Sequence, residues 1–73
     1  MIHQLKIRAE YLEQVQLGNK NFEIRSNDRD FKVGDLVELM EIGSSNSARC
    51  LITFVTDFEQ KEGYVVFGMK VLT

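Results

Sequence analysis

The sequence contains only one cysteine and one histidine among its 73 residues. A single cysteine cannot form a disulfide within the chain, and a structural zinc site needs a Cys/His cluster that is missing here. Apolar stretches are only a few residues long, far short of the ~20 residues that span a bilayer. There is no repeat or low-complexity tract. We therefore expect one cytoplasmic domain over residues 1–73, without disulfide, metal, cofactor or membrane partner.

The chain also lacks an excess of positive charge, since nine Lys and Arg residues face eleven Asp and Glu residues, giving a net charge of −2. This balance argues against indiscriminate nucleic-acid binding driven by overall charge. A hydrophobic content of 44%, with two tyrosines and five phenylalanines, is ordinary for a globular chain and argues against disorder. Composition alone does not indicate RNA.

Residue patterns predict five strands and one short helix. Alternating or wholly apolar segments indicate the strands, and Gly18 is a good helix terminator because glycine accepts a left-handed conformation. The expected strands are 3–8, 21–25, 36–42, 49–58 and 64–72, and the expected helix is 10–17. Several strands are apolar on both sides, which favours a mainly β (α+β) fold, a closed or nearly closed small barrel of about five strands with one helix.

The segment after the helix is the richest in chemistry. Strict alternation places Glu23 and Arg25 on one side of a strand and Phe22 and Ile24 on the other, with Lys20 at its mouth. A carboxylate beside a guanidinium can orient a planar polar ligand, since one accepts from amino groups and the other grips phosphate or carbonyl oxygens. From the charge pattern alone, a solvated, self-neutralising stripe is the favoured interpretation.

The loop that follows has two interpretations. Asn27 and its neighbours can form an Asx-type turn, in which side chains bond to nearby backbone amides. Alternatively, Arg29 and Lys32 reach phosphate oxygens while Asn27 or Asp28 contacts a base edge. A cation held by Glu23, Asp28 and Asp30 is disfavoured, because the spacing matches no calcium or magnesium loop.

The pattern G-x-K-x-x-E-x-R over residues 18–25 resembles the signature of the ASCH domains, a branch of the PUA-like β-barrels. The whole path resembles the DUF3850 family within that superfamily, through residues 3–7, the helix with Tyr11 and Leu12, residues 27–31, 33–35 and 63–66. The resemblance implies a PUA-like barrel with a cleft between helix and barrel wall that binds RNA or a nucleotide-like ligand. It assigns that cleft to Lys20, Glu23, Arg25, Asn27, Arg29 and Lys32.

Two alternatives remain open. Some ASCH relatives are amidohydrolases acting on modified pyrimidines or resemble ribonucleases, and in that case Lys20 and Glu23 are the catalytic candidates. Lys20 matches the lysine of the amidohydrolase motif, whereas Glu23 stands where those enzymes have threonine. The third hypothesis is a protein-interaction module, with another protein or a second copy of the chain as the partner that the charged loop contacts.

The remaining singular residues favour structural roles. His3 lies on the apolar side of the first strand, where a satisfied and partly buried imidazole is expected. Cys50 is expected to be a buried, unreactive thiol. All five phenylalanines have the spacing of core residues, and Tyr11 and Tyr64 are assigned to core filling in preference to stacking on a base.

Overall fold

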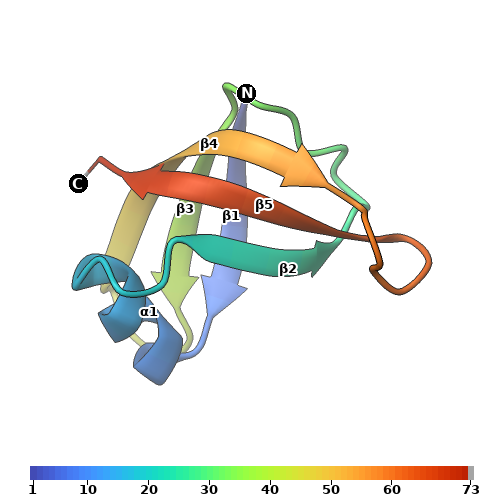
Figure 1. Cartoon of the computed structure of the whole chain (residues 1–73). Helices are drawn as coiled ribbons and strands as arrows, with labels where there is room; N and C mark the ends of the chain where they lie inside the picture. Colours follow the sequence, from blue (N-terminus) through green and yellow to red (C-terminus); the bar gives the residue numbers. More distant parts are fainter. Residues whose placement is uncertain (73) are drawn as a thin grey trace.

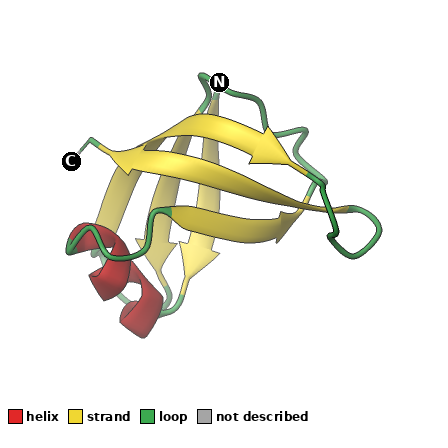
Figure 2. Cartoon of the chain, viewed as in Figure 1, coloured by secondary structure: helices red, strands yellow, loops and turns green. Residues whose placement is uncertain are grey.

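The computed structural model describes residues 1–72 and contains five strands and one short helix (Figures 1 and 2). Thr73, the last residue of the expected domain, lies outside the described residues. The predicted element order is confirmed, with bounds that move by one or two residues. The elements are β1 (Ile2–Ile7), α1 (Ala9–Gln16), β2 (Phe22–Ser26), β3 (Leu36–Glu41), β4 (Ser47–Thr56) and β5 (Tyr64–Val71).

All five strands form one sheet in the order β1-β3-β4-β5-β2. β1 and β3 run parallel, and every other neighbouring pair is antiparallel. The sheet curls into a half-barrel in which β1 and β2 are the two edge strands, and α1 lies at the end where β1 and β3 finish (Figure 1). The expected small barrel with one helix is therefore present, with an opening between its two edges.

The helix packs one apolar side against the sheet and stops at Gly18. Leu12 and Val15 are fully buried, and α1 contacts β3 and β4. Gly18 adopts φ +82°, and its N–H donates to the carbonyl of Val15 while the N–H of Asn19 donates to Gln14. This pair of bonds is a Schellman motif, which glycine closes without a Cβ clash. The turn sends the chain back toward the start of β2.

The core fills the inside of the curled sheet. It combines alternate residues of every strand except β2 with the helix residues and one loop aromatic. Its members are Leu5, Ile7, Leu12, Val15, Phe31, Val37, Leu39, Ala48, Cys50, Ile52, Val65, Phe67 and Met69. Among residues 1–72, no helix has the length and apolar character to cross a membrane.

Three of the five phenylalanines are not core residues, which corrects the expectation from spacing. Phe22, Phe54 and Phe58 are 43%, 61% and 62% exposed. A register shift between Ile52 and Phe54 inserts one extra residue in β4, so the alternation reverses and Phe54 points outward. Phe22 is on edge strand β2, where the inward positions are taken by Glu23 and Arg25 as described below.

The tyrosines also depart from the core assignment, whereas the cysteine and histidine follow the prediction. Tyr11 is 46% exposed and Tyr64 is 36% exposed. Cys50 is fully buried, and this burial raises the pKa of its thiol. The imidazole of His3 is also buried, and its Nε2 lies 2.8 Å from Oδ2 of Asp35. The edge of that ring contacts Phe31, with ring centroids 4.8 Å apart.

The Asp35 carboxylate links the first strand to the loop before β3. Its hydrogen bond with His3 lowers the pKa of the Asp35 carboxyl, with a further contribution from the backbone N–H of Lys32. A carboxyl whose pKa is lower in the folded state stabilises the fold while it is ionised, and this contribution disappears as pH falls through the folded pKa. Asp35 therefore makes the free energy of unfolding depend on pH below its usual pKa of 3.8.

We expect the wild-type protein to lose stability as the pH is lowered from 5 to 2, and Asp35→Asn to show a smaller loss over the same range. Urea unfolding at each pH, followed by circular dichroism, measures the difference. The matched control is Asp28→Asn, which changes an exposed carboxylate of the same loop. Equal slopes for wild type and Asp35→Asn would show that the Asp35 contacts do not contribute.

Candidate functional site

A buried carboxylate organises the start of β2. Glu23 is 5% exposed and faces inward beside Phe67, its register partner on β5. Its Oε1 accepts from Nζ of Lys20 and its Oε2 accepts from Nε of Arg25 at 2.8 Å. A buried carboxylate is costly unless it is paired and hydrogen-bonded, and here both oxygens have cationic donors. The three residues that the sequence singled out therefore meet in one cluster.

Lys20 is held on the helix side of this cluster. Besides Glu23, its Nζ donates to the carbonyl of Phe22 at 2.8 Å. The ammonium also lies 5.6 Å from the ring centroid of Tyr11 and 5.0 Å from that of Phe22, within the range of cation–π attraction. Since an ammonium has three donors, one of them remains for a further acceptor.

Arginine side chains bridge the opening between the two sheet edges. The Nη2 of Arg25 donates to the carbonyl of Lys6 at 2.9 Å, and Nη1 of Arg29 donates to the carbonyl of Gln4 at 2.8 Å. The carbonyls of Gln4 and Lys6 face the free edge of β1. On the opposite side of this part of the chain, the carbonyls of Met1 and Ile7 accept from the backbone N–H groups of Leu36 and Ile42. Guanidinium groups thus replace the backbone ladder that would close a complete barrel.

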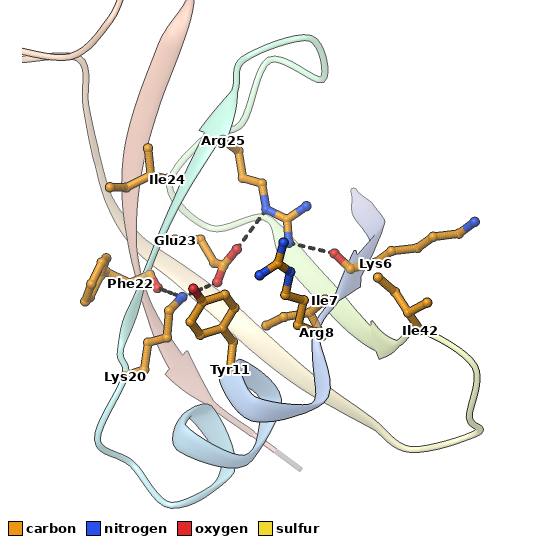
Figure 3. A pocket seen from close by; sticks show the side chains of 10 residues that line it. All are labelled: Lys6, Ile7, Arg8, Tyr11, Lys20, Phe22, Glu23, Ile24, Arg25 and Ile42. Carbon is orange, nitrogen blue, oxygen red and sulfur yellow. Dashed lines mark hydrogen bonds and ion pairs between the residues drawn. The ribbon is translucent and has the colours of Figure 1, made fainter.

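An open pocket of about 610 Å³ lies over this opening (Figure 3). We call it the edge pocket, because both sheet edges and the start of α1 form its walls. Its volume is within the range of pockets that take small ligands. The lining residues are Lys6, Ile7, Arg8, Tyr11, Lys20, Phe22, Glu23, Ile24, Arg25 and Ile42.

The edge pocket is strongly cationic in a chain of net negative charge. Three cationic side chains, those of Arg8, Lys20 and Arg25, surround one carboxylate, Glu23, whose oxygens are both bonded. The side chain of Lys6 extends away from this group (Figure 3). Tyr11 and Phe22 add two partly exposed aromatic rings. Positive charge focused in a concave site attracts anions, and exposed rings offer faces for stacking.

Arg8 is the residue that sequence reasoning missed. It is exposed, and its guanidinium lies between Tyr11 and Arg25 without a hydrogen bond or ion pair to another pocket side chain (Figure 3). Arg25, in contrast, is already bonded to Glu23 and Lys6. The only sequence signal for Arg8 was its place at the junction between the first strand and the helix.

Three of the six residues assigned to nucleic-acid binding lie outside the edge pocket. The Oδ1 of Asn27 accepts from the backbone N–H of Phe31, a bond from a side chain to a nearby amide as considered above, but four residues on and not two as in an Asx turn. Arg29 bonds to the edge of β1, and exposed Lys32 pairs with Asp30 at 3.2 Å. The structure thus brings Lys20, Glu23 and Arg25 together, and leaves Asn27, Arg29 and Lys32 in the loop.

A metal centre has no support in the geometry of residues 1–72, where no three His, Cys, Asp or Glu side chains are grouped so that they could hold an ion. The carboxylates of Asp28 and Asp30 do not join Glu23 in the edge pocket. The chemistry that the pocket offers is therefore cationic and aromatic.

Comparisons with known proteins identify relatives without an assigned activity. The family model described as "Domain of unknown function (DUF3850)" matches residues 2–69. An "Uncharacterized 12.9 kDa protein in GpA 3'region" of Escherichia phage P2 is 34% identical over 70 residues, which cover 89% of this chain. The chain spans 64% of the length of that relative.

The fold also occurs in a solved structure. The crystal structure of hypothetical protein PH0355 superposes with a TM-score of 0.72, over 99% of this chain and all of the other. The two sequences are 15% identical, so the likeness concerns the fold alone.

Proposed function

The chain belongs to the DUF3850 family of domains, and we propose that it binds a nucleotide unit, either free or within single-stranded RNA, in the edge pocket. The observation that carries this proposal is the convergence of three cationic side chains, those of Arg8, Lys20 and Arg25, on a pocket whose single carboxylate is buried and doubly paired (Figure 3). We extend the proposal to an ASCH-type, PUA-like ancestry, which the G-x-K-x-x-E-x-R run and the half-barrel support, and to a cytoplasmic location.

Arg8 is the proposed anchor for the phosphate. A free guanidinium binds phosphate through two parallel hydrogen bonds, and its affinity does not have to compete with an existing partner. Lys6 contributes its backbone carbonyl, which holds Arg25 beside Arg8, while its ammonium extends away from the pocket (Figure 3). Arg8 lies between the last residue of β1 and the first residue of α1, so both elements fix its backbone.

The base of the nucleotide is assigned to the side of the pocket formed by Tyr11, Phe22 and Lys20. Aromatic rings stack on bases, and the remaining Nζ donor of Lys20 can bind a base carbonyl. Glu23 is a positioning residue in this scheme, because its oxygens hold Lys20 and Arg25 in place and are buried away from the ligand.

The proposal is tested by measuring binding of the four nucleoside monophosphates and of a single-stranded RNA to wild type and Arg8→Ala. Loss of one charge-assisted phosphate contact, worth roughly 1.5 kcal/mol, is expected to weaken binding about tenfold. It should also reduce the salt slope by ~0.7 for RNA. Lys32→Ala is the control, since it removes one exposed cation outside the pocket.

Equal affinities for Arg8→Ala and Lys32→Ala, or no binding by the folded wild type, would contradict the proposal. Comparing the affinities for nucleoside monophosphates and for single-stranded RNA shows whether the pocket takes a free nucleotide or one within a strand. Cleavage of RNA, or hydrolysis of an acylated cytidine, that is lost in Lys20→Ala would support the catalytic alternative instead.

A further inference from the structure

The outer side of β2, β5 and β4 bears two exposed aromatic rings in one row. In the sheet register, Phe22 on β2 is opposite Gly68 on β5, and Gly68 is opposite Phe54 on β4. Residues in one row of a sheet point to the same side, and neighbouring strands are about 4.8 Å apart. Two phenylalanines therefore flank a glycine on one surface, about 10 Å from each other along the row.

The next row extends this surface with further apolar side chains. Ile24, which is 53% exposed, is opposite Val66, and Lys70 follows Gly68 by two residues on the same side of β5. An exposed apolar surface of this kind marks an interaction site more often than isolated exposed residues do. We call this surface the outer platform, and it consists of Phe22, Ile24, Phe54, Val66, Gly68 and Lys70.

Nothing in the fold requires glycine at position 68. Its φ is not in the left-handed region, and a Cβ there would meet Oγ1 of Thr53 at 3.5 Å and Cβ of Phe54 at 3.6 Å, which are ordinary contacts. A glycine within a strand often marks a place where a ligand approaches the backbone closely. Here the absence of a side chain leaves space on the sheet surface between the two phenylalanine rings.

The charges of the outer platform fit a polyanion. The three strands contain one carboxylate between them, that of Glu23, and it is buried on the inner side. The outward cations are Lys70 and Arg49, the second of which pairs with Glu38 of β3. Among residues 1–72, the platform itself therefore presents one unpaired cation, Lys70, and no carboxylate, a charge that attracts phosphates and repels a second copy of the same surface.

The outer platform is continuous with the edge pocket. Phe22 and Ile24 line the pocket and also belong to the platform. The ammonium of Lys20 lies 5.0 Å from the Phe22 ring centroid, so a cation stands at the boundary between the two surfaces. A chain of nucleotides that leaves the pocket over β2 meets Gly68 and then Phe54.

We propose that the outer platform stacks the bases of single-stranded nucleic acid adjacent to the nucleotide held in the edge pocket. This inference rests on the proposed function, which it extends from one nucleotide to a strand. Aromatic residues on the open side of a sheet stack bases with little regard to sequence, because every base has a π-face. The expected ligand is therefore single-stranded RNA or DNA with weak sequence preference.

A length series tests the platform separately from the pocket. Binding of single-stranded oligouridines of one, two, four and eight nucleotides to the wild type should become tighter with length. In Phe54→Ala the affinity for the eight-nucleotide strand should fall about tenfold, as expected for loss of one stacking contact, while affinity for the mononucleotide stays unchanged. Gly68→Val should have a similar effect, because the added side chain occupies the space between the two rings.

The control variant is Phe58→Ala, which removes an equally exposed phenylalanine from the turn after β4. The inference fails if Phe54→Ala binds the eight-nucleotide strand as tightly as Phe58→Ala does, or if wild-type affinity does not rise with length. Binding of the mononucleotide would then still support the edge pocket, whereas its absence would contradict the proposed function as well. The inference also fails if sedimentation shows that Phe54→Ala only dissociates a dimer without changing affinity for the strand.

Discussion

Replacing Glu23 with alanine is expected to lower the free energy of unfolding by about 3 kcal/mol. The substitution removes the acceptor of both Lys20 and Arg25 and leaves two partly buried cations close together without a counter-charge. Removing one partner of a buried ionic cluster is more costly than breaking an exposed pair, since the remaining charge keeps its desolvation penalty. Urea unfolding followed by circular dichroism measures the change.

Glu23→Gln is the matched variant, because its amide oxygen can still accept one hydrogen bond in the same volume. Glu23→Gln should therefore lose less stability than Glu23→Ala. Under conditions where both variants are folded, Glu23→Gln should bind nucleotides more weakly than the wild type, and Glu23→Ala should bind them more weakly still. The reason is that Lys20 and Arg25 lose their fixed positions. Alanine and glutamine variants as stable as the wild type would show that the cluster is an incidental surface contact.

Replacing Phe67 with alanine is expected to have the largest effect on stability, a loss of about 3–5 kcal/mol. Phe67 is fully buried, packs against Phe31 with ring centroids 4.9 Å apart, and lies beside Glu23 in the register of β2 and β5. A 73-residue domain has a total stability of roughly 4–11 kcal/mol, so the variant approaches complete unfolding.

Phe54→Ala is the control for this prediction, since the same substitution on the outer side of β4 creates no cavity. Its free energy of unfolding should stay within about 0.5 kcal/mol of the wild type. Phe67→Leu should be intermediate, because the core keeps most of the buried volume. A loss below about 1 kcal/mol for Phe67→Ala would contradict the assignment of this ring to the centre of the core.

The sequence predicted the elements and the central cluster because their causes are local. Alternation and turn residues fixed five strands and a helix, and Gly18 ends that helix through its own backbone preference. Lys20, Glu23 and Arg25 lie within six residues of one another, so their spacing along one strand was sufficient to bring them together.

The outward position of the aromatics could not be predicted in the same way. One extra residue between Ile52 and Phe54 reverses the alternation of β4, and no proline or glycine in that strand marks it. On β2, alternation predicted only that every second residue faces inward. The apolar character of Phe22 and Ile24 favoured these two residues over Glu23 and Arg25 for the inner side. Glu23 occupies the inner side instead, because two cationic side chains compensate its burial at the open edge of the sheet.

The position of Arg8 beside the edge pocket depends on tertiary structure. β1 and β2 are far apart in the sheet order and meet only across the opening of the half-barrel. Arg8 comes close to the cluster on β2 because the sheet curls. The residues around position 8 do not predict this curvature. The loop residues Asn27, Arg29 and Lys32 resemble a binding motif in sequence, yet their bonds are to the protein itself.

Nucleotide binding in the edge pocket is tested most directly by nuclear magnetic resonance of the ¹⁵N-labelled protein during titration with nucleoside monophosphates. We expect saturable shifts of the backbone amide signals of residues 6–11 and 20–25, which surround the pocket. Signals of the turn between β4 and β5, at residues 57–63, should stay in place. Shifts confined to that turn, or the absence of any saturable shift at millimolar nucleotide, would contradict the assignment of the edge pocket as a nucleotide site.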